Sequence, residues 1–338
     1  MKAMVLTAPG HVEMQDVDTP VPAPGEALIR ITHSGICGTD RKIYDNSIPV
    51  HHPLIMGHEM IGVIEEGKGG GGAGPGTRVL VDPVMYCGKC YHCRAGQTHL
   101  CPTGLLKGRD QDGGFAQYVT APTDHIYPLP DDVGDKDAAL IQVLTTCLHA
   151  QRMAPVSKGE AVIVFGLGVT GQLHVQLAKA HGAGLVIGIT RSQWKRELAE
   201  ELGADLTLAP GPDTKDKILE LTEGRGADLV IETTGSVSVL AQALDLARIG
   251  GRVLPFAIYT AKEAPLPFYQ FYFKELNIIN ARAAKGEDFP ESVELVRSGK
   301  VKLDPLITHV MPLAEIGKAL DMLESSDEKT MKIILDNS

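Results

Sequence analysis

No apolar run in this sequence is long enough to span a membrane. The first residues, MKAMVLTAPGHVEMQD, hold a single lysine and no sustained apolar segment, so we expect no secretory signal and a cytoplasmic protein. The chain also has fewer positive than negative residues, and its formal net charge is -10. An acidic surface repels the phosphate backbones of nucleic acids. No internal repeat is present. The sequence therefore argues against membranes and nucleic acid as partners.

The chain contains enough apolar residues for a globular protein with more than one core. Its 338 residues exceed what one hydrophobic core usually serves, so two domains are expected. Apolar residues make up 43% and charged residues 22%, which separates the chain from disordered proteins. Four of the six cysteines crowd into one short segment. In a reducing compartment this crowding indicates metal binding more than disulfide bonds.

The first third of the chain has the pattern of a mostly β domain. Short β-forming runs such as ALIRITHSGIC, MIGVIEEG and TRVLVDP are broken by proline and glycine. The glycine-rich stretch at residues 67–76 is interpreted as a flexible surface turn between two strands, because glycine loses too much backbone entropy inside a strand or helix.

From Ala161 onward, strands and helices alternate. The expected strands are AVIVFG, LVIGIT, LTLAP, DLVIETTG, GRVLPFAIY and ELNIINA. The helical patterns between them cover residues 172–183, 193–205, 216–226 and 238–250. Continuous apolar strands separated by helices predict an α/β fold with a Rossmann-type doubly wound parallel sheet. Two further helices, at 291–300 and 313–323, and a strand at 330–336 form a tail that we expect to return to the first domain.

The loop after the first of these strands matches the dinucleotide-binding pattern GxGxxG. It reads Gly166, Leu167, Gly168, Val169, Thr170 and Gly171. The first glycine would make the tight turn, the second would let the backbone approach a pyrophosphate, and the third would let the helix pack against the sheet. The helix N-terminus would offer free N–H groups to the phosphates. A plain strand–helix turn is the competing interpretation.

The end of the second strand favours NADP over NAD. NAD sites usually place an Asp or Glu about 20 residues after the glycine loop, where it binds the adenosine ribose. This sequence has Thr190, Arg191 and Ser192 at the strand end instead. Arg191 can pair with a 2′-phosphate, and the two hydroxyls can donate hydrogen bonds to it. The alternative is that Arg191 is a solvated residue at a strand end.

The four crowded cysteines are the most specific signal in the sequence. Their spacing is C-x2-C-x2-C-x7-C, from Cys87, Cys90, Cys93 and Cys101. Four thiolates at this spacing can wrap one tetrahedral zinc and leave no position open for water. The intervening segment has no apolar period, so metal binding would contribute its folding energy. A redox role or disulfide bonds are the competing interpretations.

A second possible metal group combines Cys37 with His58, and both are ligand types that suit zinc. A catalytic zinc needs three protein ligands and an open position, where it acts as a Lewis acid on an alcohol or carbonyl. A buried free cysteine and an unrelated histidine are an equally good interpretation of these two residues alone.

Together these motifs resemble the zinc-containing medium-chain alcohol dehydrogenase family, and within it the branch of polyol, sugar and threonine dehydrogenases. The resemblance runs in order from Lys2 to near the C-terminus. It implies a discontinuous, mostly β, GroES-like catalytic domain beside the Rossmann domain. We expect the catalytic domain to cover residues 1–144 and 284–338 with a structural zinc lobe at 85–103, and the NAD(P)-binding domain to cover 145–283.

The resemblance also implies roles for residues around Cys37 and His58, which would bind the catalytic zinc. Alcohol dehydrogenase is itself an established example of a catalytic zinc site, so this assignment follows known chemistry. Glu59 is expected as a ligand or an exchangeable near ligand. Thr39 matches the hydroxyl that takes the substrate proton, and Asp40 matches the residue that holds His58.

Two residues depart from the family pattern. The position of the remaining zinc ligand, usually Glu or Cys in the family, is occupied by Gln142. Its amide oxygen is neutral and binds a metal more weakly than a carboxylate does. Some sugar dehydrogenases of the family also have Gln at this position. Zinc with one thiolate, one imidazole and the Glu59 carboxylate would be formally neutral, and exchange of Glu59 for Gln142 would leave one positive charge. Lys42 stands where many relatives have a relay histidine. It fits a relay, a ribose contact or a solvated charge, and the relay is the least expected because exposed lysine titrates far above neutral pH.

The expected function is hydride transfer between an alcohol (a secondary alcohol, polyol or sugar) and NADP, with NAD the less expected cofactor and two zinc ions per chain. The resemblance suggests a homodimer or homotetramer. One alternative is a quinone or enoyl reductase on the same scaffold, a class that lacks both zinc motifs. The other is a redox-sensing or catalytically weak NADP-binding homologue, an interpretation that Gln142 keeps open. Specificity is expected to lie in the loops at 44–53 and 268–273, which one sequence does not decode.

Overall fold

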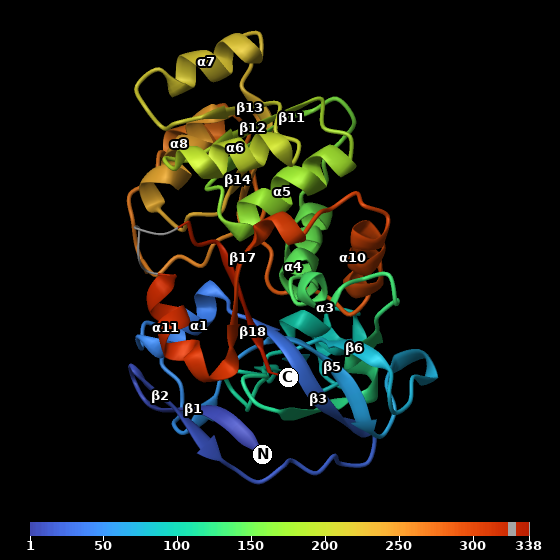
Figure 1. Cartoon of the computed structure of the whole chain (residues 1–338). Helices are drawn as coiled ribbons and strands as arrows, with labels where there is room; N and C mark the ends of the chain where they lie inside the picture. The colour runs from blue at the N-terminus through green and yellow to red at the C-terminus, as the bar shows by residue number, and fades with distance from the viewer. Residues whose placement is uncertain (324–328, 338) are drawn as a thin grey trace. The chain divides into compact units, whose positions relative to one another are not determined.

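The computed structural model describes residues 1–323 and 329–337, and the chain divides into two compact units (Figure 1). Unit 1 contains Met1–Thr145, Lys285–Arg297 and Leu303–Ser338. Unit 2 contains Thr146–Ala284 and Ser298–Lys302. No described helix is long and apolar enough to cross a membrane.

Unit 1 consists mainly of antiparallel strands. The strands of its largest sheet are β3 (Glu26–Gly35), β5 (Glu59–Glu66), β6 (Arg78–Val81), β9 (Tyr118–Pro122), β10 (Ile126–Pro128), β17 (Ile307–Pro312) and β18 (Lys332–Asp336). Their order is β10-β6-β5-β3-β18-β17, and β9 also pairs with β3. Two smaller sheets are formed by β1 (Lys2–Ala8), β2 (His11–Asp16) and β4 (Leu54–Ile55), and by β7 (Val84–Met85) and β8 (Leu105–Leu106).

Strand β3 organises the large sheet. Its alternating sequence buries Ala27, Ile29 and Ile31, which pack in one core cluster with apolar side chains of β5, β6 and β9. Strand β18, from the end of the chain, pairs antiparallel with β3 and places Ile334 opposite Gly35. The tail of the chain therefore completes the sheet that leads into the candidate active site.

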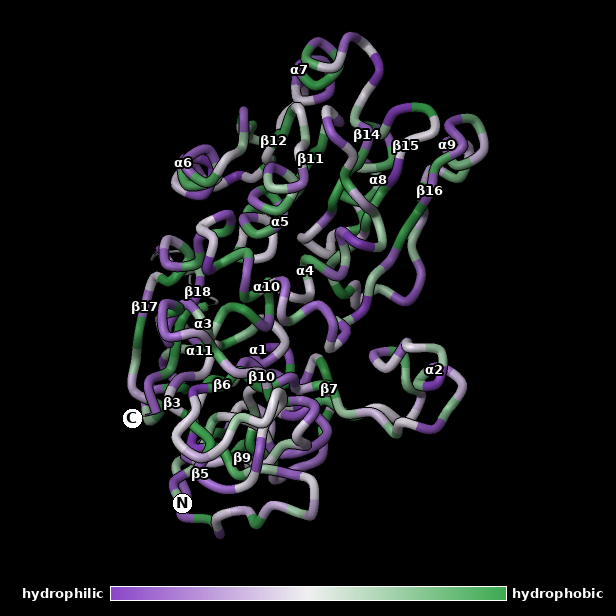
Figure 2. The backbone as a smooth tube through the Cα atoms, turned by 90° about the vertical axis from the view of Figure 1, so that its right-hand side faces the viewer, coloured by the Kyte–Doolittle hydropathy of each residue, from purple (hydrophilic) through white to green (hydrophobic). Residues whose placement is uncertain are grey.

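The helices of unit 1 are short. They are α1 (Gly38–Tyr44), α2 (Tyr91–Arg94), α3 (Asp135–Ala138), α10 (Asp288–Arg297) and α11 (Ile316–Met322). The boundary between the units falls inside α4 (Ile141–Met153). The segment that carries α2 projects from the rest of unit 1, beyond β7 (Figure 2).

Unit 2 contains a parallel sheet of six strands in the order β13-β12-β11-β14-β15-β16, which confirms the predicted Rossmann-type fold. Its strands are β11 (Ala161–Phe165), β12 (Leu185–Ile189), β13 (Leu206–Leu208), β14 (Ala227–Glu232), β15 (Ala247–Pro255) and β16 (Asn277–Ile278). Its helices are α5 (Val169–Ala180), α6 (Gln193–Glu201), α7 (Thr214–Leu221), α8 (Val237–Leu246) and α9 (Phe268–Phe273).

Both faces of the parallel sheet are covered. Val162 and Val164 of β11 share a core cluster with Val175 and Ala178 of α5. The intervening Ile163 belongs to a second cluster with apolar residues of α7 and α8. Burial on both faces explains why the strand sequences are continuously apolar rather than alternating.

Two local predictions were wrong in their extent. The helix expected at 238–250 ends at Leu246, because Gly250 has a φ of 68° and its N–H donates to the carbonyl of Lys274, which starts the next strand early. The strand expected from ELNIINA is only the two residues of β16. The glycine-rich stretch is a turn between β5 and β6, as predicted; it contains a 3-10 helix, Gly70–Gly72, and Gly69 is buried against Ile126.

Candidate active site and metal centres

The four lobe cysteines lie together, as the spacing predicted. Cys90 and Cys93 have their sulfurs 3.4 Å apart, and the pairs Cys87–Cys93 and Cys90–Cys101 are each at 4.0 Å. A tetrahedral zinc with bonds of about 2.3 Å requires sulfurs about 3.8 Å apart. All six cysteines are free thiols. The lobe therefore has the geometry of a zinc site with four thiolates and no open position.

Backbone groups of the lobe favour the thiolate form of Cys87, whereas burial raises the pKa of the Cys93 thiol. The N–H groups of Lys89 and Cys90 hydrogen-bond to the sulfur of Cys87 and lower the pKa of its thiol to about 6. His92 contacts Gln97 through its Nδ1 at 3.2 Å, outside the group of four sulfurs. His99 is buried and likewise lies outside the group of four sulfurs.

A second metal-binding group forms where β3 leads into α1 and where β5 begins. One ligand atom each from Cys37, His58 and Glu59 lies within 4.8 Å of the others. Cys37 is the N-cap residue of α1, and the histidine and glutamate are adjacent at the start of β5. Because β3 and β5 are paired with Gly35 opposite Glu59, the sheet brings these distant parts of the sequence together.

Asp40 positions two of these residues. Its Oδ2 accepts a hydrogen bond from the backbone N–H of Cys37 at 2.8 Å, and its Oδ1 lies 3.3 Å from His58 Nδ1. A carboxylate at Nδ1 leaves Nε2 of His58 for a metal. Burial disfavours the protonated ring, but the Asp40 and Cys37 side chains outweigh it and raise the pKa of His58 well above its ordinary value. The same negative groups would favour a cation at this position.

Glu59 is fully buried and forms an ion pair with Lys332 of β18. The Lys332 ammonium also donates to the carbonyl of Ile36 at 2.9 Å. The Glu59 carboxylate lies so close to Gly35 that a Cβ there would overlap it. Its second oxygen, Oε1, has no hydrogen-bond donor among residues 1–323 and 329–337. A buried oxygen without a donor, beside Cys37 and His58, fits a metal-ligand position.

The other residues expected at this site lie on α1 and α4. Thr39 and Lys42 are half-buried on α1, one and four residues after its first glycine. Gln142 is buried in the first turn of α4, and its amide forms no hydrogen bond within the described part of the chain. Among the described residues no hydrogen bond or ion pair joins Gln142 to Cys37 or His58, so its role as a ligand stays a prediction.

The glycine loop of unit 2 has the backbone that a dinucleotide requires. Gly166 has a φ of 83°, which favours glycine, and a Cβ at Gly171 would overlap the carbonyl oxygen of Gly166. A Cβ at Gly168 would meet nothing within 4 Å, so the backbone faces open space there. The half-buried Val169 and Thr170 form the first turn of α5, whose free N–H groups can receive a phosphate.

The end of β12 presents positive charge and hydroxyls, with Arg191 exposed and Thr190 and Ser192 half-buried. Arg196, which the sequence analysis missed, donates from Nη1 to the carbonyls of Thr190 at 3.0 Å and of Arg191 at 2.8 Å. This guanidinium fixes the loop and adds a second positive charge beside it. Arg196 lies five residues after Arg191, in the first turn of the helix α6, and this spacing could have indicated a second arginine near the loop.

Comparisons with known proteins agree with this geometry. The family model described as the alcohol dehydrogenase GroES-like domain matches residues 23–131, and the model described as a zinc-binding dehydrogenase matches residues 169–298. Sorbitol dehydrogenase from Halalkalibacterium halodurans is 33% identical over 341 residues, covering 99% of each chain. L-threonine 3-dehydrogenase from Pyrococcus horikoshii is 36% identical over 318 residues, covering 91% of each.

Solved structures show the same relationship. A protein from Sinorhizobium meliloti 1021 described as a zinc-binding dehydrogenase, bound to NADP, superposes with a TM-score of 0.90 at 30% identity, covering 99% of this chain and 98% of that one. An alcohol dehydrogenase from Escherichia coli complexed with NADH superposes with a TM-score of 0.92 at 28% identity, covering 99% of each chain.

The parallel dinucleotide-binding sheet and the cysteine- and histidine-containing groups define an oxidoreductase that combines zinc with a nicotinamide cofactor. This chain belongs to the zinc-type medium-chain alcohol dehydrogenase family. The predicted family, the GroES-like and Rossmann fold classes and the dehydrogenase activity are thereby confirmed.

Proposed function

We propose that the enzyme oxidises a secondary hydroxyl of a small polar molecule, such as a polyol or sugar, with NADP, and that it holds one catalytic and one structural zinc ion per chain. The observation that carries this proposal is the buried group of Cys37, His58 and Glu59, in which charged partners fix the imidazole and the carboxylate. Quinone and enoyl reductases on this scaffold have no use for such a group.

When bound, the zinc supplies a Lewis acid for the alcohol oxygen, and the nicotinamide supplies the hydride acceptor. Cys37 and His58 hold the metal. Asp40 keeps His58 Nδ1 protonated and its ring fixed, so that Nε2 is presented as a ligand. Thr39, half-buried in the first turn of α1, would accept the proton of the substrate hydroxyl and pass its own hydroxyl proton outward. Lys42, one helical turn after Thr39, takes no part in this proton transfer and is either a solvated charge or a contact to the cofactor ribose.

Lys332 changes the expected charge of the site. The sequence alone suggested a neutral site, with a doubly charged metal balanced by Cys37 and Glu59. The ion pair adds a buried ammonium, which leaves one positive charge on the metal, Cys37, Glu59 and Lys332 taken together, and the buried Asp40 carboxylate beside His58 compensates that charge. We infer that Lys332 offsets the negative charge of Glu59 and makes it an exchangeable ligand, and that Gln142 is its neutral replacement. Both effects favour an ionised alcohol oxygen.

The preference for NADP is supported by the loop after β12. Arg191 is exposed and forms no ion pair among the described residues, and Arg196 lies beside it. Arg191→Ala should raise the apparent KM for NADP about 10- to 100-fold, as expected for loss of a charge-assisted contact worth roughly 1.5–3 kcal/mol, and should leave the KM for NAD nearly unchanged. Equal effects on both cofactors, or a native preference for NAD, would contradict the proposal.

The substrate class is supported by the relatives. Sorbitol, L-threonine at its 3-position and 2-dehydro-3-deoxy-L-galactonate at its 5-position are named in the relatives' activities, and each presents a secondary hydroxyl in a short polar molecule. A dehydrogenation screen of polyols, sugars, hydroxy amino acids and simple secondary alcohols, read as NADPH formation, tests this. Metal-loaded protein that binds NADP but turns over no member of the panel would favour the catalytically weak homologue instead.

We further infer that copies of this chain associate through the β16 edge of the parallel sheet, as a homodimer or homotetramer. Among the described strands β16 pairs only with β15, and the adjacent α9 exposes Phe268, Tyr269, Tyr272 and Phe273 at 65%, 71%, 82% and 56%. An open sheet edge beside exposed aromatic side chains favours pairing with a second copy. Light scattering should give a multiple of 36.1 kDa, and Tyr272→Ser should reduce it. A monomer at micromolar concentration would contradict the inference.

A further inference from the structure

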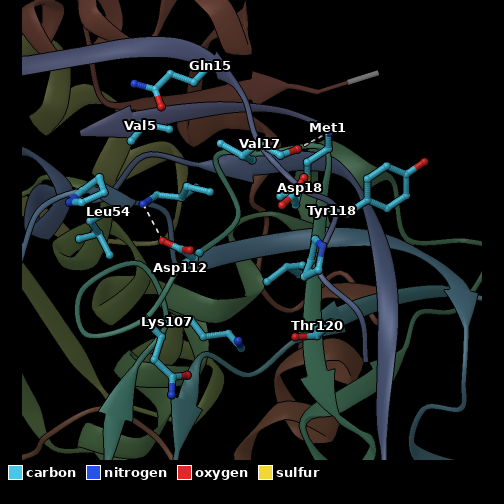
Figure 3. A pocket seen from close by; sticks show the side chains of 16 residues that line it. Met1, Val5, Gln15, Val17, Asp18, Leu54, Lys107, Asp112, Tyr118 and Thr120 are labelled. Carbon is cyan, nitrogen blue, oxygen red and sulfur yellow. Dashed lines mark hydrogen bonds between the residues drawn. The ribbon is translucent and has the colours of Figure 1, made fainter. Parts of the chain in front are cut away.

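Unit 1 contains a cavity of about 370 Å³ that takes no part in the chemistry described above (Figure 3). Strands β1, β2 and β9 contribute to its wall together with the loop at residues 107–113. None of the cysteines or histidines of the two metal groups lines it. The volume lies at the lower end of the range of roughly 300–1,000 Å³ for ligand pockets, so the occupant would be a small molecule.

Lys107, in the wall of this cavity, is a buried cation without a partner. Its residue is 7% exposed, and its ammonium forms no hydrogen bond or ion pair among residues 1–323 and 329–337. Burial lowers the pKa of Lys107, and the more distant carboxylates of Glu26 and Asp112 oppose that effect. Asp112 accepts a hydrogen bond from the backbone N–H of Ile55 at 2.9 Å instead. A largely buried ammonium with no described carboxylate within ion-pair distance would be stabilised by an anion bound in this cavity.

Other unused polar groups face the same space. Figure 3 shows the Lys107 ammonium pointing toward β9, the strand that carries Thr120. The Thr120 hydroxyl and the Gln111 amide also line the cavity, and neither side chain forms a hydrogen bond with a described residue. An ammonium, a hydroxyl and an amide that surround one space can all donate to a carboxylate.

The other residues that line the cavity indicate which kind of anion fits it. Asp18 and Asp112 place negative charge in the wall, which disfavours a doubly charged ligand such as phosphate. Val5, Val17 and Leu54 supply an apolar surface on which a short hydrocarbon chain can be buried. The charge and the apolar surface together fit a singly charged molecule with one polar end.

We propose that this cavity is a binding site for a small monocarboxylate, whose carboxylate pairs with Lys107 and Thr120 and whose apolar part lies against Val5 and Leu54. The site goes beyond the proposed dehydrogenase activity, because it uses no residue assigned to zinc, nicotinamide or alcohol. Its failure would leave the proposed function unaffected.

Isothermal titration of the zinc-loaded full chain with sodium butyrate, at constant ionic strength, tests the proposal. We expect saturable binding of one butyrate per chain. Lys107→Met should weaken it at least tenfold and Thr120→Val several-fold, whereas Lys68→Met, which removes an exposed ammonium of unit 1, should leave it unchanged. Inorganic phosphate should bind more weakly than butyrate.

Carboxylates also bind metals, so the titration is repeated with Cys37→Ser. Binding that persists in Cys37→Ser and disappears in Lys107→Met supports the cavity. Binding that disappears in Cys37→Ser and persists in Lys107→Met places butyrate at the catalytic metal and overturns the proposal. Absence of saturable binding, or tighter binding of phosphate, also overturns it. If Lys107→Met does not fold, Thr120→Val decides, because unchanged affinity in that variant contradicts the assigned contacts.

Discussion

The lobe site and the catalytic site hold metal ligands in opposite ways. The lobe takes all four of its ligands from residues 87–101, a segment with short helices and little apolar sequence. The candidate catalytic group takes Cys37 from the turn between β3 and α1 and takes His58 and Glu59 from the beginning of β5, and Asp40 and Lys332 hold His58 and Glu59 in place. The first arrangement depends on local sequence, and the second depends on the sheet.

We expect this difference to separate two uses of the same metal. We expect the lobe to need zinc to fold, because its sequence offers few apolar residues for a core and metal binding energy there is folding energy. A site whose ligands are already positioned by buried charges can lose its metal and keep its structure. Changes in the lobe should therefore be seen first in stability, and changes in the catalytic group should be seen first in turnover.

The largest expected effect on activity is that of Cys37→Ser. Loss of the thiolate should remove the catalytic zinc, and turnover should fall at least about 1,000-fold, since the Lewis acid contributes several kcal/mol to the reaction. Circular dichroism and the urea midpoint should stay close to those of the unchanged enzyme. A variant that loses its fold together with its activity would break the comparison. Cys147→Ser, at a buried cysteine outside both groups, should retain both zinc ions.

Cys101→Ser should have the largest effect on stability. With three thiolates the lobe loses its closed zinc site, and we expect a loss of several kcal/mol and a fall in Tm of about 10 °C. Limited proteolysis should then cut between residues 85 and 103, which stay protected in the unchanged enzyme. A lobe that resists protease after this change would show that its fold does not depend on zinc.

Asp40→Asn should lower the zinc affinity of the catalytic site and leave that of the lobe unchanged. The amide keeps the shape of the side chain but no longer presents a negative charge to His58, and loss of such a partner typically weakens metal binding about 10- to 100-fold. Competition with a chelator should remove one zinc ion earlier from this variant and the other at an unchanged concentration. Equal retention of both ions would mean that Asp40 does not support the catalytic metal.

Lys332→Met has the smallest expected effect in the loaded enzyme. Removing one partner of a buried ion pair leaves the Glu59 carboxylate uncompensated and should lower the free energy of unfolding of the metal-free protein by about 3 kcal/mol. Bound zinc can take over the role of the counter-ion, so the loss should be smaller in the loaded protein. Urea unfolding in both states measures this, and Lys332→Arg should restore most of the stability. An equal loss in both states would contradict the role of Glu59 beside the metal.

Features formed by residues close together in the sequence could be predicted from it. The lobe followed from the spacing of Cys87 to Cys101, because short loops keep neighbouring cysteines close in any fold. The parallel sheet followed from continuous apolar strands between helices, and the glycine loop followed from its place after β11. In these cases the residues that interact are separated by few positions.

Features that depend on pairing between residues far apart in the sequence could not be predicted from it. Lys332 meets Glu59 only because β18 and β5 both pair with β3, and no periodicity at either position indicates that register. The buried ammonium of Lys107 is likewise set by how its loop packs on β9 and β1. Helix α1 escaped notice because its first residues are Gly38 and Thr39, and its start rests on the capping contacts between Cys37 and Asp40.

The most direct test of the account is the zinc content per chain of the unchanged enzyme, Cys37→Ser and Cys101→Ser, measured by mass spectrometry on the same samples that are assayed for NADPH formation. The account predicts two zinc ions in the unchanged enzyme. It predicts one, with turnover abolished, in Cys37→Ser, and a loss of stability together with zinc in Cys101→Ser. Unchanged enzyme that is active without zinc, or Cys37→Ser that retains two zinc ions while losing turnover, would contradict it.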